Sequence, residues 1–474
     1  MYHHKGRLCS VHANYTPQTW TSDIRAAKAA HIDAFALNTG FGLQHTTDSL
    51  SDAFAAAESL DFKLFFSFDY TNTTYGNNGY GRWPQSEITR LLNEYIVHEA
   101  YFRTPYKGSS RPLVSTFEGF EATADWVGIK EDVDEDIVFI PAWTSVDPVS
   151  ASKIRSIDGL MSWDAWPGGT NDMSTSDDEA YRAVLDSSGK DKLYIMPVSP
   201  WLYANLPAFG KNVVSRGDDL WYVRWQQVLT LDPAPDFVGI ISWNDYGQSH
   251  YVGPLHGEIG MGMLMDAGAP FDYVAGMPHD GWRALLPYLI EQYKAGSEGE
   301  RKKVEIEEEL LSVWYRLSPA KACEDGGTTG NTEESDQMIL GPGEVLEDKV
   351  FYSALLEEGA NVSVVIGGES GAAGWTNTPE SGRGVYHGSV DMGDREGEVV
   401  VMLSRNGDIF REMRGKSIEL QENCPLNQTN WNAWVGVGNA TDRALQVGNG
   451  VGGTPQPGQS WLGILIVVGL LIWG

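Results

Sequence analysis

The sequence predicts an α/β fold: a (β/α)8 barrel of the TIM type, with its first strand missing or degraded, followed by a small all-β sandwich domain. Seven apolar segments alternate with amphipathic helical segments between residues 20 and 245. Strands that are each followed by a helical crossover form a parallel sheet with both faces covered. From about Cys323 the segments alternate and are broken by glycines, which is typical of an all-β domain.

Apolar runs of strand length mark the expected sheet, at Ile32–Leu37, Lys63–Phe68, Pro112–Phe117, Ile137–Ala142, Gly159–Trp163, Leu193–Val198 and Phe237–Trp243. Helical patterns fall between them, at Asp48–Leu60, Gln85–Tyr101, Asp177–Ser187 and Gly217–Leu231. Seven strands suggest eight, the number in a closed barrel. The eighth would be the first, around Arg7–His12, where the pattern is poor. An open doubly wound sheet is the alternative, although no glycine-rich phosphate loop follows any strand.

The domain boundaries follow from these changes of pattern in a chain of 474 residues. We expect the barrel over residues 1–295, and a linker with a connecting strand over 296–322. The β-sandwich is expected over 323–426, a flexible Gly/Asn-rich stalk over 427–460, and a hydrophobic tail over 461–474. We expect the protein to be a monomer.

The amino-acid composition of the chain limits the classes of ligand that it can bind. The net charge of -30 argues against nucleic acid and anionic lipid surfaces, which demand Lys and Arg. With 17 Trp, 20 Tyr and 16 Phe, the chain suits a neutral sugar ligand, whose apolar faces stack on aromatic rings. The ten His are scattered and no HExxH or paired CxxC motif occurs, so we expect no metal and no cofactor. No G-x-S-x-G motif follows a strand, so the sequence gives no indication of an ester hydrolase.

The two termini predict different locations. The amino terminus has no apolar signal-peptide core. The carboxyl terminus carries small residues at Gly448–Gly450, a polar spacer and the apolar segment 461–474, which together match a lipid-anchor signal. A short tail anchor or an error of gene prediction are the alternatives. Because such signals operate on secreted chains, we expect an extracellular, surface-attached protein whose true amino terminus is missing here.

Three carboxylates, Asp69, Asp164 and Asp245, lie at or just past the carboxyl ends of expected strands. In parallel α/β proteins, ligands bind at these strand ends. Each aspartate alone could cap a helix or close a turn. Three of them converging on one mouth beside tryptophans are hard to explain as capping.

Paired carboxylates beside Trp and Tyr suit the cleavage of a glycosidic bond. One acid protonates the departing oxygen, and the other activates water or attacks the sugar carbon. We expect the aromatic rings to form sugar platforms and the polar groups to orient hydroxyls. The predicted substrate-binding residues are Asn38, Trp163, Asp164, Trp166, Trp201, Tyr203, Trp243, Asn244, Tyr246, His250 and Tyr251.

Several long motifs, in order over residues 14–320, resemble glycoside hydrolase family 71, the fungal α-1,3-glucanases or mutanases. They are IDAFALN (32–38), KLFFSFD (63–69), GLMSWDAWP (159–167), VSPWLY (198–203), WNDYGQSHY (243–251) and WYR (314–316). The resemblance implies a barrel plus β-sandwich and endo-type, inverting hydrolysis of α-1,3-glucan in fungal cell walls. It also implies catalytic positions at Asp69, Asp245 and Gln248.

The family pattern has glutamate where this chain has Gln248. An amide cannot transfer the catalytic proton, and loss of proton transfer costs about 10²–10⁴-fold in rate. Three interpretations stay open. The chain is a crippled enzyme that binds glucan; another acid, such as Asp164 or Asp69, carries the proton; or Gln248 positions water while Asp245 and Asp69 form the working pair. A second departure is the missing first strand, for which a truncated gene is the favoured explanation.

The main hypothesis is therefore an α-1,3-glucan hydrolase of reduced or uncertain activity. The alternative, from a different class, is a catalytically impaired α-glucan-binding wall protein. A glycosidase with a shifted linkage preference is a third option.

Overall fold

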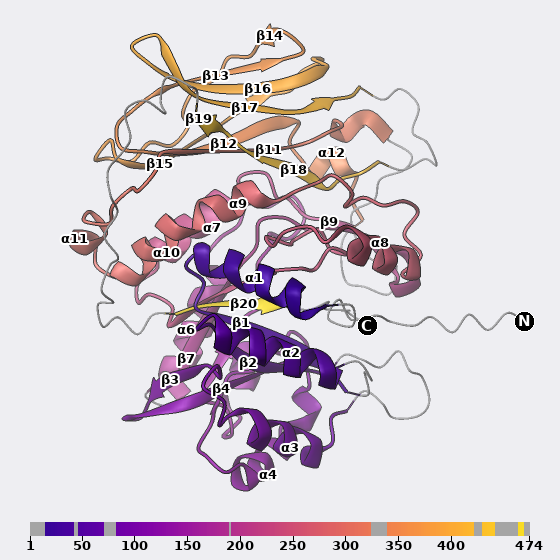
Figure 1. Ribbon diagram of the computed structural model, residues 1–474, viewed down its shortest axis with the longest axis vertical. Coiled ribbons are helices and arrows are strands. Elements are labelled where there is room, and N and C mark those ends of the chain that lie inside the picture. Colours follow the sequence, from indigo (N-terminus) through magenta and orange to yellow (C-terminus); the bar gives the residue numbers. More distant parts are fainter. Residues whose placement is uncertain are drawn as a thin grey trace, which may run out of the picture.

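The computed structural model describes residues 15–41, 46–70, 82–188, 191–323, 339–420, 429–440 and 463–468. It has two parts (Figure 1), an α/β part built mainly on a parallel sheet and two antiparallel sheets stacked above it. The predicted mixed α/β class with a parallel sheet is confirmed. The expected strand around Arg7–His12 lies outside the described residues.

The parallel sheet contains all seven expected segments. Its strands are β1 (Ala34–Gly40), β2 (Lys63–Asp69), β4 (Ser109–Phe117), β5 (Val138–Phe139), β6 (Gly159–Met161), β7 (Leu193–Val198), β10 (Phe237–Ile240) and β20 (Gly463–Val468), with β3 (Arg103–Tyr106) antiparallel to β4. The order is β3-β4-β2-β1-β20-β10-β7-β6, and β5 pairs with β4. Single bridges from Ala142 to Phe117 and to Met161 link β4 to β6. β10 ends at Ile240, three residues before the predicted end.

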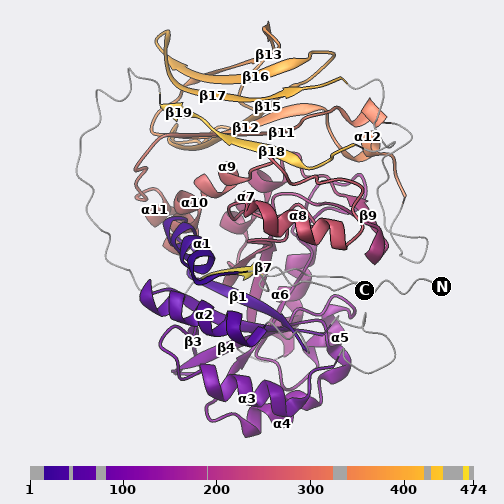
Figure 2. The same ribbon diagram turned by 45° about the vertical axis from the view of Figure 1, so that its right-hand side comes forward.

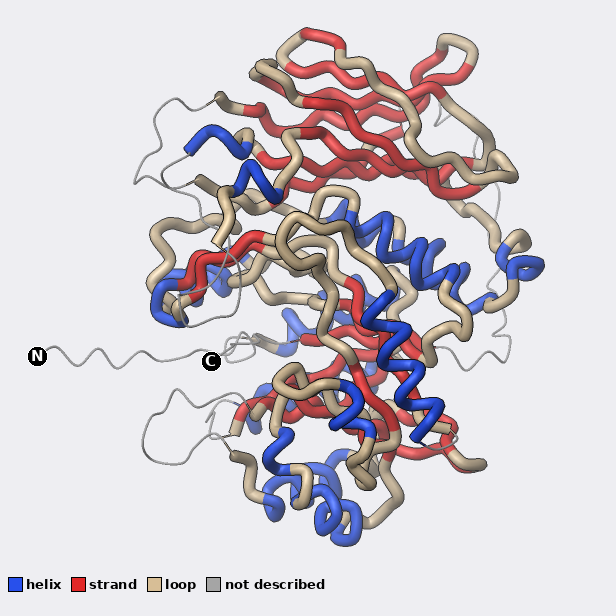
Figure 3. The backbone as a smooth tube through the Cα atoms, turned by 180° about the vertical axis from the view of Figure 1, so that it is seen from behind, coloured by secondary structure: helices blue, strands red, loops and turns tan. Residues whose placement is uncertain are grey.

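Helices cover the outside of this sheet (Figure 3). The first is α1 (Pro17–Ala29), which begins with Pro17 at its first turn and a capping box between Thr16 and Thr19. The others in this part are α2 (Thr46–Ser59), α3 (Gln85–Tyr95), α4 (Asp125–Asp132), α5 (Pro148–Ser152), α6 (Ser176–Ser188), α7 (Leu220–Thr230), α8 (Gly257–Asp266), α9 (Asp280–Ala284), α10 (Leu286–Ala295) and α11 (Glu298–Arg301). None of the described helices combines the length and the hydrophobicity needed to cross a bilayer.

The strand β20 lies within the segment 461–474, which was predicted to be a hydrophobic C-terminal tail. It lies between β1 and β10, parallel to both, with Leu465 opposite Ala34 on one side and Gly239 on the other. Leu465 is buried in the core. Gly463 packs on the ring of Phe237, where an added Cβ would lie 2.8 Å from a ring carbon. The segment therefore occupies the sheet position at which the sequence lacked a strand.

The upper part consists of two antiparallel sheets (Figure 2). One is ordered β15-β12-β11-β18 and the other β14-β13-β16-β17-β19. The first comprises β11 (Leu310–Arg316), β12 (Lys349–Leu356), β15 (Gly384–Asp391) and β18 (Ala433–Val437). The second comprises β13 (Asn361–Ile366), β14 (Glu369–Ser370), β16 (Gly397–Arg405), β17 (Asp408–Ile418) and β19 (Asn439–Ala440), and the short helix α12 (Pro342–Val345) precedes β12.

The first of these sheets is the middle layer of the molecule. Trp314 and Phe351 on one face join the core of the α/β part, whereas Val313 and Tyr352 on the other face join a core shared with the second sheet. Two predicted boundaries change as a result. The connecting strand predicted within 296–322 is β11, which belongs to this sheet as an inner strand, and the segment 427–460, predicted to be a flexible stalk, contains β18 and β19.

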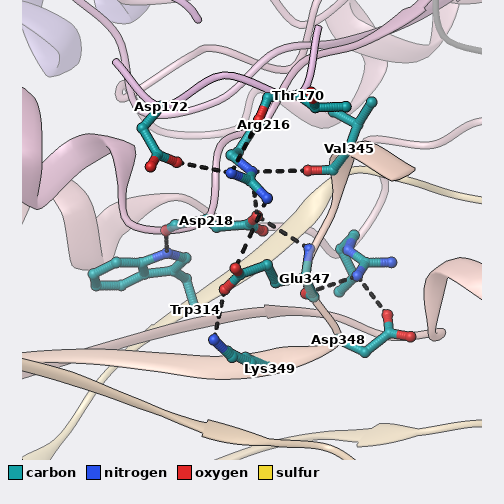
Figure 4. A network of polar contacts seen from close by, with 10 residues as sticks. Thr170, Asp172, Arg216, Asp218, Trp314, Val345, Glu347, Asp348 and Lys349 are labelled. Atoms are coloured by element: carbon teal, nitrogen blue, oxygen red, sulfur yellow. Dashed lines mark hydrogen bonds and ion pairs between the residues drawn. The ribbon is translucent and has the colours of Figure 1, made fainter. Parts of the chain in front are cut away.

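Polar contacts bind the middle layer to the loop after the hairpin β8 (Tyr203–Leu206) and β9 (Lys211–Val214) (Figure 4). Arg216 contacts Asp172 at 2.7 Å and donates to the carbonyl of Val345 at 3.0 Å. The carboxylate of Asp218 accepts a hydrogen bond from the amide of Glu347 at 3.1 Å, and burial raises the pKa of Asp218 to about 7. The hairpin is thereby held against the upper part.

Candidate active site

The loop after β10 folds back on itself. The amide of Ser242 donates to the carbonyl of His250, and the amide of Val252 donates to the carbonyl of Ser242, both at 2.9 Å. These bonds fix the segment 242–252 at the carboxyl end of the strand, where a polar cluster was predicted. Every side chain from Ser242 to Val252 is buried. The cluster is thus a compact internal network rather than an open loop.

Asp245 is the centre of this network. Its Oδ1 accepts the backbone amide of Gln248 at 3.0 Å, and its Oδ2 accepts the side-chain amide of Gln248 at 2.7 Å. The Nε2 atom of His250 lies 3.3 Å from the same Oδ2. The Asp245 side chain has 0% exposure, because these donors enclose it. A buried carboxylate surrounded by donors is stabilised in its ionised form by each of these bonds.

Lys211, on β9, fixes the orientation of the Gln248 amide. Its Nζ donates to Oε1 of Gln248 at 3.1 Å. An ammonium group only donates, so the amide oxygen must face Lys211 and the amide nitrogen must face Asp245. In the reverse orientation, the amide nitrogen would face the Lys211 ammonium, donor to donor, and the amide oxygen would face the Asp245 carboxylate, acceptor to acceptor. Burial holds the pKa of Lys211 well below its usual range, although the charge of Asp245 acts in the other direction.

His250 is neutral in this environment. Burial lowers its pKa to about 3, and the positive charge of Lys211 acts in the same direction. The hydroxyl of Ser242 lies 2.9 Å from Nδ1 of His250 and accepts the amide of Asp245 at 3.0 Å. Because the Asp245 carboxylate only accepts hydrogen bonds, the proton of the neutral imidazole belongs on Nε2, and the Ser242 hydroxyl then donates to Nδ1.

Asn244 is anchored to the amino-terminal helix. Its Nδ2 donates to the hydroxyl of Tyr15 at 2.9 Å, and that hydroxyl donates to Asp23 at 2.7 Å. The other oxygen of Asp23 lies 2.8 Å from Nε2 of His256. Asn244 is fully buried, so it supports the loop and does not present its amide to a ligand.

Asp69 and Asn38 lie on neighbouring strands. Asp69 is the last residue of β2 and pairs in register with Gly40, while Asn38 pairs with Ser67. Both side chains keep 6% exposure, and the indole of Trp83 donates to the backbone carbonyl of Asp69 at 3.1 Å. Two strands, β1 and β20, lie between β2 and β10 in the sheet. The strand that Asp69 ends and the strand that precedes Asp245 are therefore three strand spacings, or about 14 Å, apart along the sheet.

Asp164 follows β6 and lines a cavity of about 290 Å³. Trp163, Tyr181, Asp147 and Asp177 also line it. Asp164 is exposed at this cavity, and within the described ranges no group donates a hydrogen bond to its carboxylate. Partial burial raises its pKa, and Asp177 and Asp178 add to this effect.

The predicted aromatic platforms divide into two groups. Trp166 is half-buried, with its ring centroid 5.3 Å from that of His250, and Trp163 lines the cavity. In contrast, the rings of Trp201, Tyr203, Trp243, Tyr246 and Tyr251 are buried in the core. Tyr251, for example, stacks on His279 at 3.9 Å. The expectation that these five present faces to a sugar is wrong, because the rings close the core above the sheet instead.

A family model for glycosyl hydrolase family 71 matches residues 7–447. The chain belongs to this family. It is similar to a mutanase of Penicillium rubens, with 30% identity over 438 residues, 90% of this chain and 87% of the relative. A glucan endo-1,3-alpha-glucosidase of Schizosaccharomyces pombe is 30% identical over 433 residues, 89% of this chain and 91% of the relative. Among solved structures, a GH99 endo-alpha-mannosidase from Bacteroides thetaiotaomicron covers 60% of this chain and 81% of its own, with 17% identity and a TM-score of 0.45.

Sequence reasoning missed three supporting residues of this family 71 site. Lys211 lies on a hairpin that was not predicted, Tyr15 precedes the first helix, and Ser242 was counted as part of a strand. Only Ser242 had a local signal, as a polar residue next to the cluster. Within the described ranges, no group of three or more His, Cys, Asp or Glu side chains could hold a metal ion.

Lys211→Met is expected to lower the kcat of this family 71 chain on α-1,3-glucan by about 10²-fold, with less change in KM. Without the ammonium, the Gln248 amide can rotate and Asp245 loses its interaction with the positive charge of Lys211. Lys211→Arg retains a charged donor and should recover part of the loss. Initial rates at several glucan concentrations check this, with the exposed Lys153→Met as the matched control. Equal rates for Lys211→Met and wild type would contradict the assigned role.

Proposed function

We propose that this family 71 chain hydrolyses α-1,3-glucan at internal bonds, with inversion at the anomeric carbon. The names of the two relatives, mutanase and glucan endo-1,3-alpha-glucosidase, support the substrate and the endo action. In this proposal the parallel strands form a closed (β/α)8 barrel, with β20 as its eighth strand, and the antiparallel sheets form a β-sandwich. Fungal cell-wall glucan would then bind at the carboxyl ends of the barrel strands.

The observation that carries the proposal is the enclosure of Asp245 by hydrogen-bond donors at the end of β10. These donors favour the ionised carboxylate, which is the form that takes a proton from water. Asp69 lies at the same rim and is proposed to take part from β2.

Gln248 in this proposal is a positioning residue. It cannot carry a proton, but its amide bridges Lys211 and Asp245. A glutamate there would attract Lys211 and repel Asp245, so that only one of the two carboxylates would ionise readily. Gln248→Glu should therefore change hydrolysis by no more than about tenfold, because the full effect of proton transfer, about 10²–10⁴-fold, is supplied by another acid.

A second function is a glucan-binding wall protein without turnover. It is favoured by the complete burial of Asp245, both of whose oxygens are already hydrogen-bonded. Glucan would then bind without being cleaved, because Gln248 replaces the residue that carries the proton.

Reducing-sugar release from insoluble α-1,3-glucan, measured beside a pull-down on the same material, separates the two functions. The hydrolase is expected to bind and to release sugar. Binding without release, followed by a gain of about 10²-fold or more in Gln248→Glu, would establish the binding protein instead. Release from other glucans in a linkage panel, but not from α-1,3-glucan, would indicate a shifted linkage preference.

We also propose that the protein acts outside the cell, at the surface. Attachment through a processed tail requires β20 to leave the sheet, since residues removed with an anchor signal cannot pair with β1 and β10. In one mature molecule, the segment 463–468 therefore either forms β20 or is removed with the anchor signal, but not both.

A further inference from the structure

We propose that Asn361 and Asn439 carry N-linked glycans, so that the outer face of the upper part is a glycosylated surface. Each asparagine begins a sequon, Asn-Val-Ser at 361–363 and Asn-Ala-Thr at 439–441. Three further sequons begin at Asn14, Asn72 and Asn427, which lie outside the described residues. Sequons are modified in chains that enter the secretory route. The inference therefore rests on the proposed location outside the cell, and it goes beyond the proposed hydrolysis.

The alternation of the strand β13 directs Asn361 away from the core. Val364 and Ile366 are buried in the core that the two antiparallel sheets share, and Val362 packs against it. Successive side chains point to opposite faces of a strand, so Asn361 and Ser363 lie on the other face. Both residues are exposed. The acceptor asparagine and the hydroxyl residue of this sequon therefore share one outward face.

That face is an outer surface of the molecule. The sheet ordered β14-β13-β16-β17-β19 is the outermost layer (Figure 1, Figure 2), and its inner face packs on the middle layer. On the neighbouring strand β16, Val401 and Leu403 are buried in the shared core. Ser404, the register partner of Asn361, therefore lies on the outward face. A substituent on Asn361 would project from this face into solvent.

Asn439 reaches the same face from the edge strand of the sheet. It begins β19 and pairs in register with Glu412 of β17. Glu412 pairs with Met402 of β16, which pairs with Ser363 of β13. Side chains directly opposite each other on neighbouring strands point to the same face. Asn439 is exposed. Both sequons whose asparagine the structure describes thus place it on one surface.

The acceptor amides make no contact that a glycan would break. Within the described ranges, neither the Asn361 nor the Asn439 side chain forms a hydrogen bond. By contrast, Asn244 and Asn432 are fully buried and hydrogen-bonded, and neither begins a sequon. An exposed Nδ2 atom without a partner in the fold can carry a substituent at no cost to native contacts.

Exposed apolar surface lies within reach of a glycan on Asn361. Ile409 has 40% exposure and is one of the few large apolar side chains that the described surface leaves open. It pairs with Ser404, which pairs with Asn361, so Ile409 and Asn361 lie two strand spacings, or about 10 Å, apart on the outward face. Met402 and Val365 are half-buried on the same face. Because glycans are bulky and solubilising, one on Asn361 would cover this apolar surface.

The modification is a group transfer from a lipid-linked oligosaccharide diphosphate. The Nδ2 atom of the asparagine forms a bond to the anomeric carbon of the first sugar. The bond from that carbon to the diphosphate oxygen breaks, and its electron pair leaves with the diphosphate. The nitrogen gives up one proton to the transferring enzyme, so the side chain stays neutral.

The test uses the full chain, secreted from yeast behind an added leader. Peptides are compared by mass spectrometry before and after an amidase converts each glycosylated asparagine to aspartate. We expect glycans on Asn361 and Asn439. Ser363→Ala should lose the glycan on Asn361 and keep that on Asn439, whereas Ser363→Thr, the matched control, should retain both. Because the leader supplies entry to the secretory route, this result does not depend on the proposed location.

A second readout measures what the glycan covers. Removal of the glycans from the folded protein should raise the fluorescence of a dye that binds exposed apolar surface, and Ile409→Ser should reduce that rise.

Secreted protein with an unmodified Asn361 and Asn439 would overturn the inference. Hydrolysis of α-1,3-glucan, measured on the same material, would then stand or fall by itself. Absence of the protein from the cell wall and medium of its own host would instead overturn the proposed location, and the glycans with it.

Discussion

Asp245→Asn is expected to lower the rate of α-1,3-glucan hydrolysis by about 10²–10⁴-fold. The carboxylate is the acceptor for the Gln248 amide nitrogen and for His250, and an asparagine cannot take a proton from water. Its amide nitrogen would also face one of these donors. A buried donor left without an acceptor costs about 1–3 kcal/mol, so a moderate loss of stability should accompany the loss of activity.

Initial rates, thermal denaturation and binding to insoluble glucan together separate these effects. The variant should stay folded and bind glucan while its turnover falls. The exposed Asp266→Asn on α8 makes the same chemical change away from the site and serves as control. A variant that hydrolyses glucan at the wild-type rate would show that Asp245 has only a structural role.

Removal of β20 is expected to cause the largest loss of stability. Truncation before Gly463 leaves β1 and β10 without the neighbour that pairs with each of them along four register positions. It also uncovers Phe237, on which Gly463 packs. The milder Leu465→Ala removes one buried side chain and should cost about 2–5 kcal/mol of the free energy of unfolding.

Chemical denaturation followed by tryptophan fluorescence measures this loss, with the exposed Val97→Ala as control. An unchanged unfolding free energy in the truncated chain would show that the segment is not an integral strand. The tail would then be available as an anchor signal, as the sequence suggested.

Much of the fold could be predicted because its signals are local. Short apolar runs alternating with amphipathic helices placed the seven parallel strands β1, β2, β4, β5, β6, β7 and β10, although β10 ends before Ser242 because the chain turns back there. β20 could not be placed in the same way. Its apolar composition is shared by membrane-anchor signals, and its partners lie more than 200 residues away. The strand β18 was hidden for a similar reason, in a Gly/Asn-rich segment that gains its pairing only beside β11.

In the candidate site, too, the sequence marked the residues that follow a local pattern and missed those that depend on tertiary contacts. The rule that ligands bind at the carboxyl ends of parallel strands selected Asp69, Asp164 and Asp245, which the structure places at or after the ends of β2, β6 and β10, and their roles stay predictions. The rule could not tell which aromatic rings face the core, so Trp243 was assigned to sugar binding although it packs against Phe35. Nor could it find Lys211, because a contact between a hairpin and a loop 37 residues later has no local pattern.

The anomeric form of the first product tests the central claim most directly. In the proposed function, Asp245 accepts a proton from a water that attacks the anomeric carbon directly, so the configuration at that carbon should invert. Time-resolved proton NMR of a soluble α-1,3-gluco-oligosaccharide digested by the purified protein should show the β-anomer first, followed by slow mutarotation. The α-anomer as first product, or no product from a substrate that the protein binds, would contradict the account.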